Sequence, residues 1–363
     1  MPASESPLKE TPTLKDTPFK ETPFKEVTDP GVRSRENLSL LEHKINELHL
    51  QIEGTRLEKL IQQLYADLEA KGLRFQPACY LSDEWGCPDG VPVIGIPFYL
   101  ANPMLTKIEE DTVGDVEGDH QILMYLRHEA GHAYNYAYRL YQTEEWHAVF
   151  GPYTRPYVEE FRPFPFSKKF VRHIPGWYAQ KHPDEDFAET FAVWLTPRLD
   201  WEQTYKEWPA LAKLQYVDRV MRALPDAVPI AAGALKGETP VEEMNYTVRE
   251  HYLRQEPADV SEQLGQLIDG DLRDLFGAPN TGEGEPVAKW IPRLRRDLVR
   301  DIGYWTGERP KVIGALLDHL AQRAGELGLM VPAEREEQMH VRFSIMVTTL
   351  VVNHLYRERF IDI

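Results

Sequence analysis

Two histidines and a glutamate near the middle of the chain have the spacing of a metal-dependent hydrolase site. The segment 128–132 reads HEAGH, so the two imidazoles are four residues apart and Glu129 directly follows the first. On an α-helix a step of four residues returns to nearly the same face, so His128 and His132 can hold one metal ion while Glu129 reaches toward a bound water. The pattern predicts a hydrolytic site that still lacks a ligand.

A catalytic zinc ion usually takes three protein ligands and leaves one position for water. In the extended HExxHxxGxxH pattern, glycine would stand at position 135 and a third histidine at 138, but the chain has Asn135 and Tyr138. The other common arrangement takes a glutamate from a later helix, followed four residues on by an acid that orients a histidine. Glu185 and Glu189 have this spacing and are the candidates for these two roles.

Residues 183–195 are predicted to form a buried helix. A proline at the first helical position and acids in the first turn are typical of a helix N-terminus. On a helical wheel Glu185 and Glu189 share one side with two alanines, and aromatic residues cover much of the rest. Buried carboxylates need a cation or hydrogen-bond donors, which a histidine-bound metal would provide. The alternative is a helix-dipole interaction at an exposed N-terminus without a metal. His182, just before this helix, either caps it or has a functional role.

The two histidines are expected on a helix over 121–141. One side of this helix is apolar, and the other carries Tyr125, His128, Glu129, His132, Asn135, Tyr136 and Arg139. A face with tyrosines and histidines suits the wall of a cleft better than open solvent. Residues 150–177 are rich in Pro, Phe, Tyr and Arg with little periodicity, which indicates either an ordered irregular segment over that cleft or a disordered lid.

Further elements follow from periodicity and from turn residues. Residues 55–71 have the pattern of an amphipathic helix that ends at Gly72. Residues 91–99 are the best strand candidate, and prolines 92 and 97 predict that it is an edge strand, which would either pair with a substrate backbone or border a sheet. Additional helices are expected over 206–222, 241–255, 287–304, 311–327 and 334–356.

Composition limits the classes of partner and compartment. The chain has 363 residues, a net charge of −17 and 42% hydrophobic residues, which suits a globular protein and argues against nucleic-acid binding. No apolar stretch approaches the roughly 20 residues of a membrane helix, and no secretory signal is recognisable, so we expect a soluble cytoplasmic protein without a membrane partner. In the cytoplasm, Cys79 and Cys87 are expected to be free thiols. The oligomeric state is not readable from the sequence.

Two motifs resemble those of the glutamate zincins, and among them those of a bacterial family of zinc-binding metallopeptidases. The resemblance covers residues 120–196 and rests on HEAGH at 128–132 and on YAQKHPDEDFAETF at 178–191. It implies one zinc ion held by His128, His132 and Glu185, with Glu129 as the general base. Tyr178 lies seven residues before Glu185, a spacing similar to that of a tyrosine beside the metal in lethal-factor-like peptidases. It would either stabilise an oxyanion or simply pack within the irregular segment.

The expected fold class is therefore α+β, mostly α. We expect a disordered Lys/Glu/Thr/Pro repeat tail over 1–33, a zincin-like domain over 34–225 with a small sheet near the histidine helix, and a C-terminal all-α unit over 226–363. The predicted activity is zinc-dependent hydrolysis of a peptide bond. The alternatives are a metal-dependent amidase acting on a small non-protein substrate and a non-catalytic binding or scaffold protein.

Overall fold

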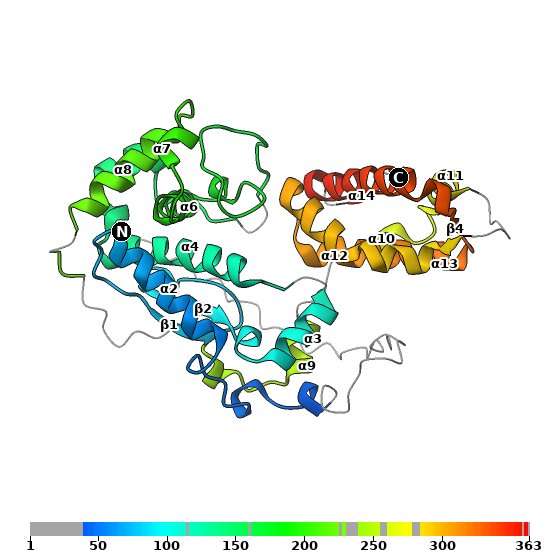
Figure 1. Ribbon diagram of the computed structural model, residues 1–363, viewed down its shortest axis with the longest axis horizontal. Coiled ribbons are helices and arrows are strands. Elements are labelled where there is room, and N and C mark those ends of the chain that lie inside the picture. Colours follow the sequence, from blue (N-terminus) through cyan, green and yellow to red (C-terminus); the bar gives the residue numbers. More distant parts are fainter. Residues whose placement is uncertain are drawn as a thin grey trace, which may run out of the picture.

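The fold is mostly helical and contains two small sheets, as expected for a mostly-α member of the α+β class (Figure 1). The computed structural model describes residues 39–113, 116–158, 161–224, 227–229, 239–254, 260–277, 284–357 and 359–361. The predicted tail over 1–33 lies outside the described residues. Within the described ranges, no helix has both the length and the apolar composition that a membrane span requires.

The first part of the described chain surrounds the histidine helix. Its elements are η1 (Ile45–Glu47), α2 (Arg56–Ala70), β1 (Ala78–Ser82), β2 (Val93–Pro97), η2 (Phe98–Ala101), α3 (Pro103–Val113), α4 (Asp119–Ala137), η3 (Leu140–Gln142), α5 (Glu144–Phe150), η4 (Tyr178–Gln180), α6 (Pro183–Leu195), α7 (Trp201–Thr204), α8 (Leu211–Arg222), η5 (Val241–Glu243) and α9 (Val248–Arg254). The helix predicted over 183–195 is confirmed as α6. The one predicted over 121–141 is α4, which ends at Ala137 because the chain turns at Arg139 with a left-handed φ of 49°.

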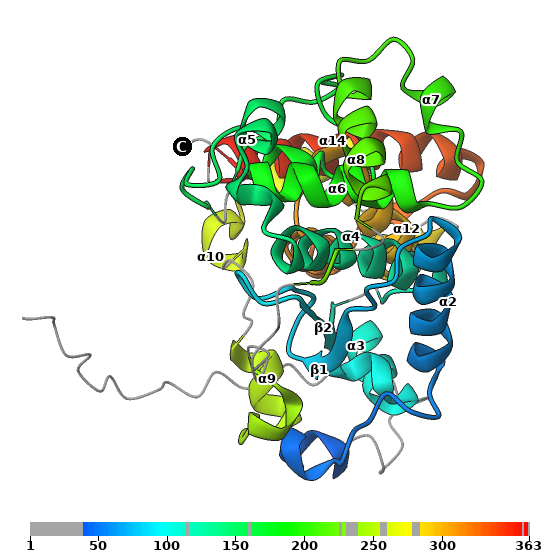
Figure 2. The same ribbon diagram turned by 90° about the vertical axis from the view of Figure 1, so that its left-hand side faces the viewer.

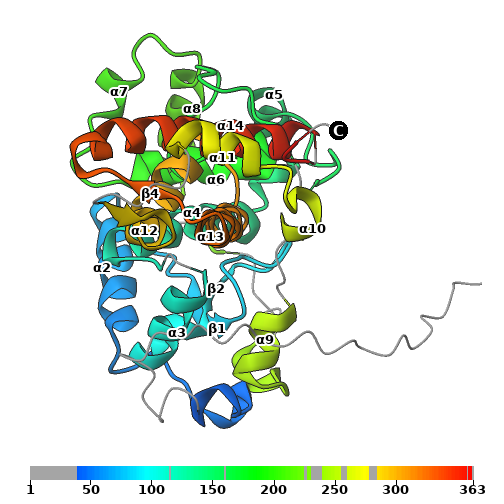
Figure 3. The same ribbon diagram turned by 90° about the vertical axis from the view of Figure 1, so that its right-hand side faces the viewer.

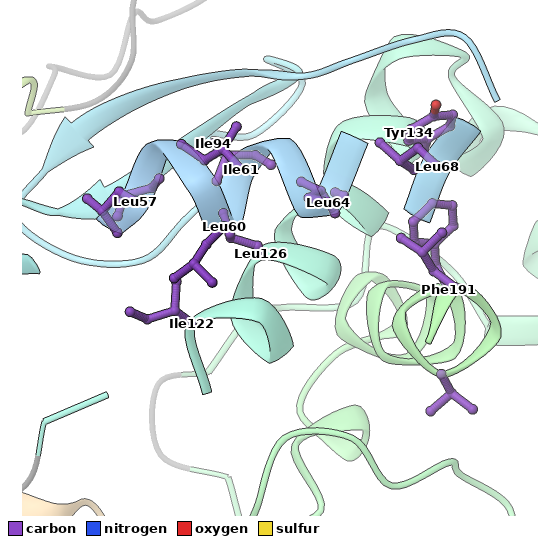
Figure 4. Packing of buried hydrophobic residues seen from close by; sticks show 14 of the residues in the cluster. Leu57, Leu60, Ile61, Leu64, Leu68, Ile94, Ile122, Leu126, Tyr134 and Phe191 are labelled. Carbon is purple, nitrogen blue, oxygen red and sulfur yellow. The ribbon is translucent and has the colours of Figure 1, made fainter. Parts of the chain in front are cut away.

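Helix α2 packs along α4 and forms much of the core. The Thr55 side chain caps α2 by accepting a hydrogen bond from the Leu57 backbone N–H. The leucines of its apolar face are buried. Figure 4 shows Leu60 near Leu126 and Ile122 of α4, and Ile61 of the same helix beside Ile94 of β2. The sheet and α2 thus hold α4 in place from the side opposite α6.

The small sheet contains the strand predicted within residues 91–99. Strand β2 pairs in parallel with β1, from Val93 opposite Ala78 to Pro97 opposite Ser82. On the other side of β2, Gly95 exchanges two backbone hydrogen bonds with Gly86. The described sheet has two strands, so β2 lies at an edge as its prolines predict. The bridge to Gly86 covers part of that edge, and all of β2 is buried. The prolines are tolerated because one precedes the strand and the other ends it.

The C-terminal helices face the viewer in Figure 3. Their buried residues form a hydrophobic cluster separate from that of the first part. The elements of this C-terminal part are α10 (Val260–Leu264), α11 (Asp269–Phe276), β3 (Glu285–Pro286), α12 (Val287–Thr306), α13 (Pro310–Glu326), β4 (Met330–Val331), η6 (Ala333–Arg335) and α14 (Glu336–Arg357). The three long helices match those predicted over 287–304, 311–327 and 334–356. The all-α expectation is wrong in one detail, because β3 and β4 form a short antiparallel pair.

The two parts meet through a close backbone contact. A Cβ on Gly176, in the irregular segment before α6, would lie 2.5 Å from Cα of Gly307, which ends α12 with a φ of +81°. Two residues without side chains therefore allow the segment and α12 to touch. Close by, the hydroxyl of Tyr356 donates a 2.9 Å hydrogen bond to the backbone oxygen of Pro163.

Candidate metal centre

Helices α4 and α6 supply the residues of the centre and lie in direct contact. Figure 1 views α6 nearly along its axis, and Figure 2, turned by 90°, views α4 that way, so the helices cross rather than run parallel. At the contact, a Cβ on Gly131 would lie 2.7 Å from Cα and 2.9 Å from the backbone oxygen of Ala188. The glycine between the two histidines thus allows the α6 backbone to lie against α4.

The start of the motif is anchored by a buried ion pair. The guanidinium of Arg127 donates from Nε and Nη2 to Oδ2 of Asp67 on α2, at 3.0 and 2.7 Å. Such a two-bond contact fixes orientation as well as position. It lies one residue before His128 and therefore holds this turn of α4 against α2.

Three potential ligand atoms form a compact triangle. The Nε2 atoms of His128 and His132 are 3.2 Å apart, and they lie 3.1 and 3.2 Å from Oε2 of Glu185. All three side chains are buried. Among the described residues, this is the group of His, Cys, Asp and Glu side chains whose donor atoms come close enough to share an ion. The two free thiols, Cys79 and Cys87, are not part of it.

Each histidine is also held by a carboxylate at its other ring nitrogen. Nδ1 of His128 is 2.9 Å from Oε1 of Glu189, the residue predicted for such a role. Nδ1 of His132 is 2.9 Å from Oδ2 of Asp184. A carboxylate on Nδ1 favours the tautomer that leaves the lone pair on Nε2 and fixes the ring orientation. Both Nε2 atoms are thereby prepared to bind a metal ion.

The two supporting carboxylates have further donors. Oε2 of Glu189 accepts hydrogen bonds from the backbone N–H groups of His173 and Ile174, at 3.2 and 2.9 Å. Asp184 accepts from the Asn135 amide at 2.6 Å and from the Tyr136 hydroxyl at 2.5 Å. Neither buried carboxylate is left without hydrogen-bond partners, which a polar group in this position requires.

The charges around the triangle are those of a cation site. Four carboxylates surround the two imidazoles, namely Glu129, Asp184, Glu185 and Glu189. Burial lowers the pKa of His128, but hydrogen bonds with Glu185 and Glu189 outweigh it and raise that pKa to about 9. Burial also disfavours the charged form of Glu185, yet the two histidines hold its pKa well below the usual range. The centre thus favours positive charge, which a divalent cation would supply.

Two tyrosine hydroxyls contact the outer oxygen of the candidate third ligand. Oε1 of Glu185 accepts a 2.7 Å hydrogen bond from Tyr157 and a 3.3 Å bond from Tyr178, the tyrosine singled out from the sequence. The two phenolic oxygens are 3.5 Å apart. Tyr157 comes from the irregular segment and is 48% exposed. The structure therefore brings Tyr178 to the centre and adds a second phenol from the segment before it.

A cleft of about 580 Å³ opens onto the centre. Its floor includes the three potential ligands and Glu129, whose carboxyl pKa is raised by burial. Its walls come from the loop after β1, from the irregular segment and from the start of α6, with lining residues that include Trp85, Asp89, Tyr153, Tyr157 and His182. His182 caps α6, because its Nδ1 accepts the Asp184 backbone N–H at 3.1 Å. The irregular segment is an ordered wall of the cleft in its described residues.

Sequence reasoning missed three partners of the predicted site residues. Asp184 precedes Glu185 directly and was interpreted only as an acid of the first helical turn. Tyr136 was placed on the cleft face of its helix, but without a partner. Tyr157 lies in a segment without periodicity, where only its residue type was a signal.

Comparison with known proteins identifies no relative. No family model matches the chain, and neither a curated protein nor a solved structure matches it. The resemblance noted in the sequence therefore rests on the two motifs alone.

Proposed function

We propose that the protein is a zinc-dependent metallopeptidase of the glutamate-zincin type. The observation that carries this proposal is the triangle of His128, His132 and Glu185 atoms at the floor of a cleft. A tetrahedral zinc site with bonds of about 2.0–2.1 Å has ligand-to-ligand edges of about 3.3 Å. The observed edges of 3.1–3.2 Å are close to this value, and the nitrogen and oxygen donors suit zinc.

The side chains of the centre have distinct tasks in this proposal. Zinc bound to the three ligands would lower the pKa of a water molecule and polarise the substrate carbonyl. Glu129 follows His128 in the same helical turn and lines the cleft, so it is the candidate to accept a proton from water and deliver it to the leaving amine. Burial raises the pKa of its carboxyl, which favours uptake of a proton by this group. Asp184 and Glu189 hold the imidazole rings.

A metal-dependent amidase is the second candidate, because the cleft volume of about 580 Å³ also lies in the range of small-molecule sites. The exposure of Tyr157 and Arg155 at the wall favours a longer substrate, since both side chains border open solvent. A set of unrelated peptides, assayed beside small N-acyl amides with the same zinc-loaded protein, distinguishes the two activities.

The test of catalysis is the Glu129→Gln variant. It keeps the size of the side chain and removes the base, so we expect turnover to be lost while bound zinc stays near one ion per chain, measured by elemental analysis. The matched variant is Glu185→Gln, which we expect to lose zinc as well as activity. A Glu129→Gln protein with wild-type turnover would exclude the proposed mechanism, and a wild-type protein that binds no zinc would favour the scaffold alternative.

A further inference from the structure

The two oxygens of the Glu185 carboxylate have different environments. Oε2 faces the Nε2 atoms of both histidines at 3.1 and 3.2 Å, whereas Oε1 is turned toward the hydroxyls of Tyr157 and Tyr178. Glu185 is 5% exposed, so bulk water has little access to its carboxylate. The arrangement separates an oxygen available to a metal from one that is occupied by hydrogen bonds.

From this we infer that Tyr157 and Tyr178 are positioning residues that keep Glu185 a monodentate ligand. The inference rests on the proposed metal function and concerns the same centre. Carboxylates bind metal ions through one oxygen or through two, and a second bond from Oε1 would occupy a coordination position. A catalytic zinc ion needs that position for water or substrate. The two phenols that donate to Oε1 stabilise the carboxylate charge on that oxygen. If the Glu185 carboxylate rotated to bring Oε1 to the ion, it would lose both of these charge-assisted hydrogen bonds.

The distances rank the two tyrosines. Tyr157 donates at 2.7 Å and Tyr178 at 3.3 Å, so the first bond is the shorter and stronger one. The ammonium of Lys181 lies 4.4 Å from the centre of the Tyr157 ring and 5.5 Å from that of Tyr178, which places a cation against both phenols. The Tyr157 ring also lies against the imidazole of His182, with 5.5 Å between ring centres. These contacts hold the Tyr157 ring although it comes from an irregular, half-exposed segment.

The same geometry gives Tyr178 a task other than oxyanion stabilisation. A phenol that donates to Oε1 acts through Glu185, whereas an oxyanion donor acts on the substrate itself. The Tyr178→Phe substitution should have a different effect for each role. Loss of the positioning role alters the coordination of a metal ion without substrate, while loss of the oxyanion role lowers kcat and leaves the coordination intact.

The experiment replaces zinc with cobalt(II), whose visible spectrum reports the coordination number. The variants are Tyr157→Phe, Tyr178→Phe and the double variant, each of which keeps its ring. Tyr153→Phe is the matched control, because this phenol lines the same cleft but donates to Asp89 rather than to a ligand. X-ray absorption of the zinc-loaded proteins counts the oxygen and nitrogen neighbours directly. Circular dichroism of the metal-free proteins verifies that each variant folds.

We expect wild type and Tyr153→Phe to give the intense bands of four-coordinate cobalt. The double variant should lose band intensity and gain one oxygen neighbour, and Tyr157→Phe should show more of this change than Tyr178→Phe. Zinc affinity should fall by about 10-fold in each single variant, as for other partners of metal ligands. If the double variant is misfolded, the comparison of Tyr157→Phe with Tyr153→Phe decides the question.

The inference is overturned if the double variant keeps the cobalt spectrum and the neighbour count of wild type. If the double variant does not fold, the same result in Tyr157→Phe overturns it. Either result leaves the proposed metallopeptidase intact. A wild-type protein that binds neither metal overturns both. A drop in kcat for Tyr178→Phe with unchanged coordination would assign that residue to the oxyanion instead.

Discussion

Replacement of Gly131 by alanine tests whether the distance between α4 and α6 determines the metal centre. The added Cβ would lie 2.7 Å from Cα of Ala188 and 2.9 Å from its backbone oxygen. Both atoms belong to the α6 backbone and cannot move aside as the end of a side chain can. To reach an ordinary contact of 3.4 Å from 2.7 Å, the backbones must separate by roughly 0.7 Å.

This displacement is small for the fold and large for the centre. Overpacking costs about 1–3 kcal/mol, and an alanine in place of a helical glycine returns about 1 kcal/mol, so the net loss of about 0–2 kcal/mol should leave the protein folded. Metal–ligand distances tolerate only about 0.2 Å, and a misplacement near 1 Å can cost about 100-fold in rate. Since the histidines lie on one helix and Glu185 on the other, we expect zinc affinity and turnover to fall on the order of 100-fold.

Zinc affinity is measured by competition with a chromophoric chelator, and stability by urea unfolding of the metal-free protein. Gly270→Ala is the control, because Gly270 is helical and a Cβ there meets no atom within 4 Å. This control should gain up to about 1 kcal/mol of stability and keep its zinc affinity. A folded Gly131→Ala protein that binds zinc as tightly as wild type would refute the reasoning.

Three further predictions concern the supports, the pH response and the metal. Asp184→Asn cannot carry the charge that holds His132, so zinc affinity should fall by about 10–100-fold in chelator competition, and an unchanged affinity would remove Asp184 from the support of the centre. Burial raises the pKa of Glu109 from 4.5 to about 7, so the folded protein holds a proton there that the unfolded chain would release. The folded state is therefore stabilised in full below about pH 4.5, and this contribution to the free energy of unfolding is lost as the pH rises through about 7. Glu109→Gln should therefore be more stable than wild type at pH 8, by up to about 3 kcal/mol in urea unfolding, with little difference at pH 4.5; equal midpoints at pH 8 would contradict this. Zinc at 100 times its Kd should raise the free energy of unfolding by about 2.7 kcal/mol, a gain that a chelator reverses and that the Glu185→Gln variant should lack.

The two helices of the centre were predictable because local signals define them. Pro183 marks the start of α6, and the aromatic and alanine positions separate its faces, so the candidate third ligand, Glu185, could be placed on this helix 53 residues after His132. The end of α4 was less well defined, since nothing in the sequence near Arg139 requires its left-handed backbone.

Other features depend on contacts between distant segments, for which one sequence holds no local signal. Asp184 has its role because α6 crosses α4 at an angle that brings it to His132, and not because of its position in the first helical turn. Strand β2 lies at the sheet edge that its prolines predict, but no local signal indicates the return of the chain that places Gly86 beside it. Tyr157 reaches Glu185 from a segment without any periodic pattern.

The contact of Gly176 with Gly307 limits where the chain can be shortened without disturbing the candidate metal centre. The backbone N–H groups that hold Glu189 belong to His173 and Ile174, three and two residues before Gly176. Helix α12 thus backs the segment that orients a histidine, although none of its residues lines the cleft. A fragment that ends before residue 260 would contain every proposed ligand yet leave this segment without its backing surface. The C-terminal helices thus support the candidate metal centre indirectly, and a shortened protein meant to keep that centre should retain them.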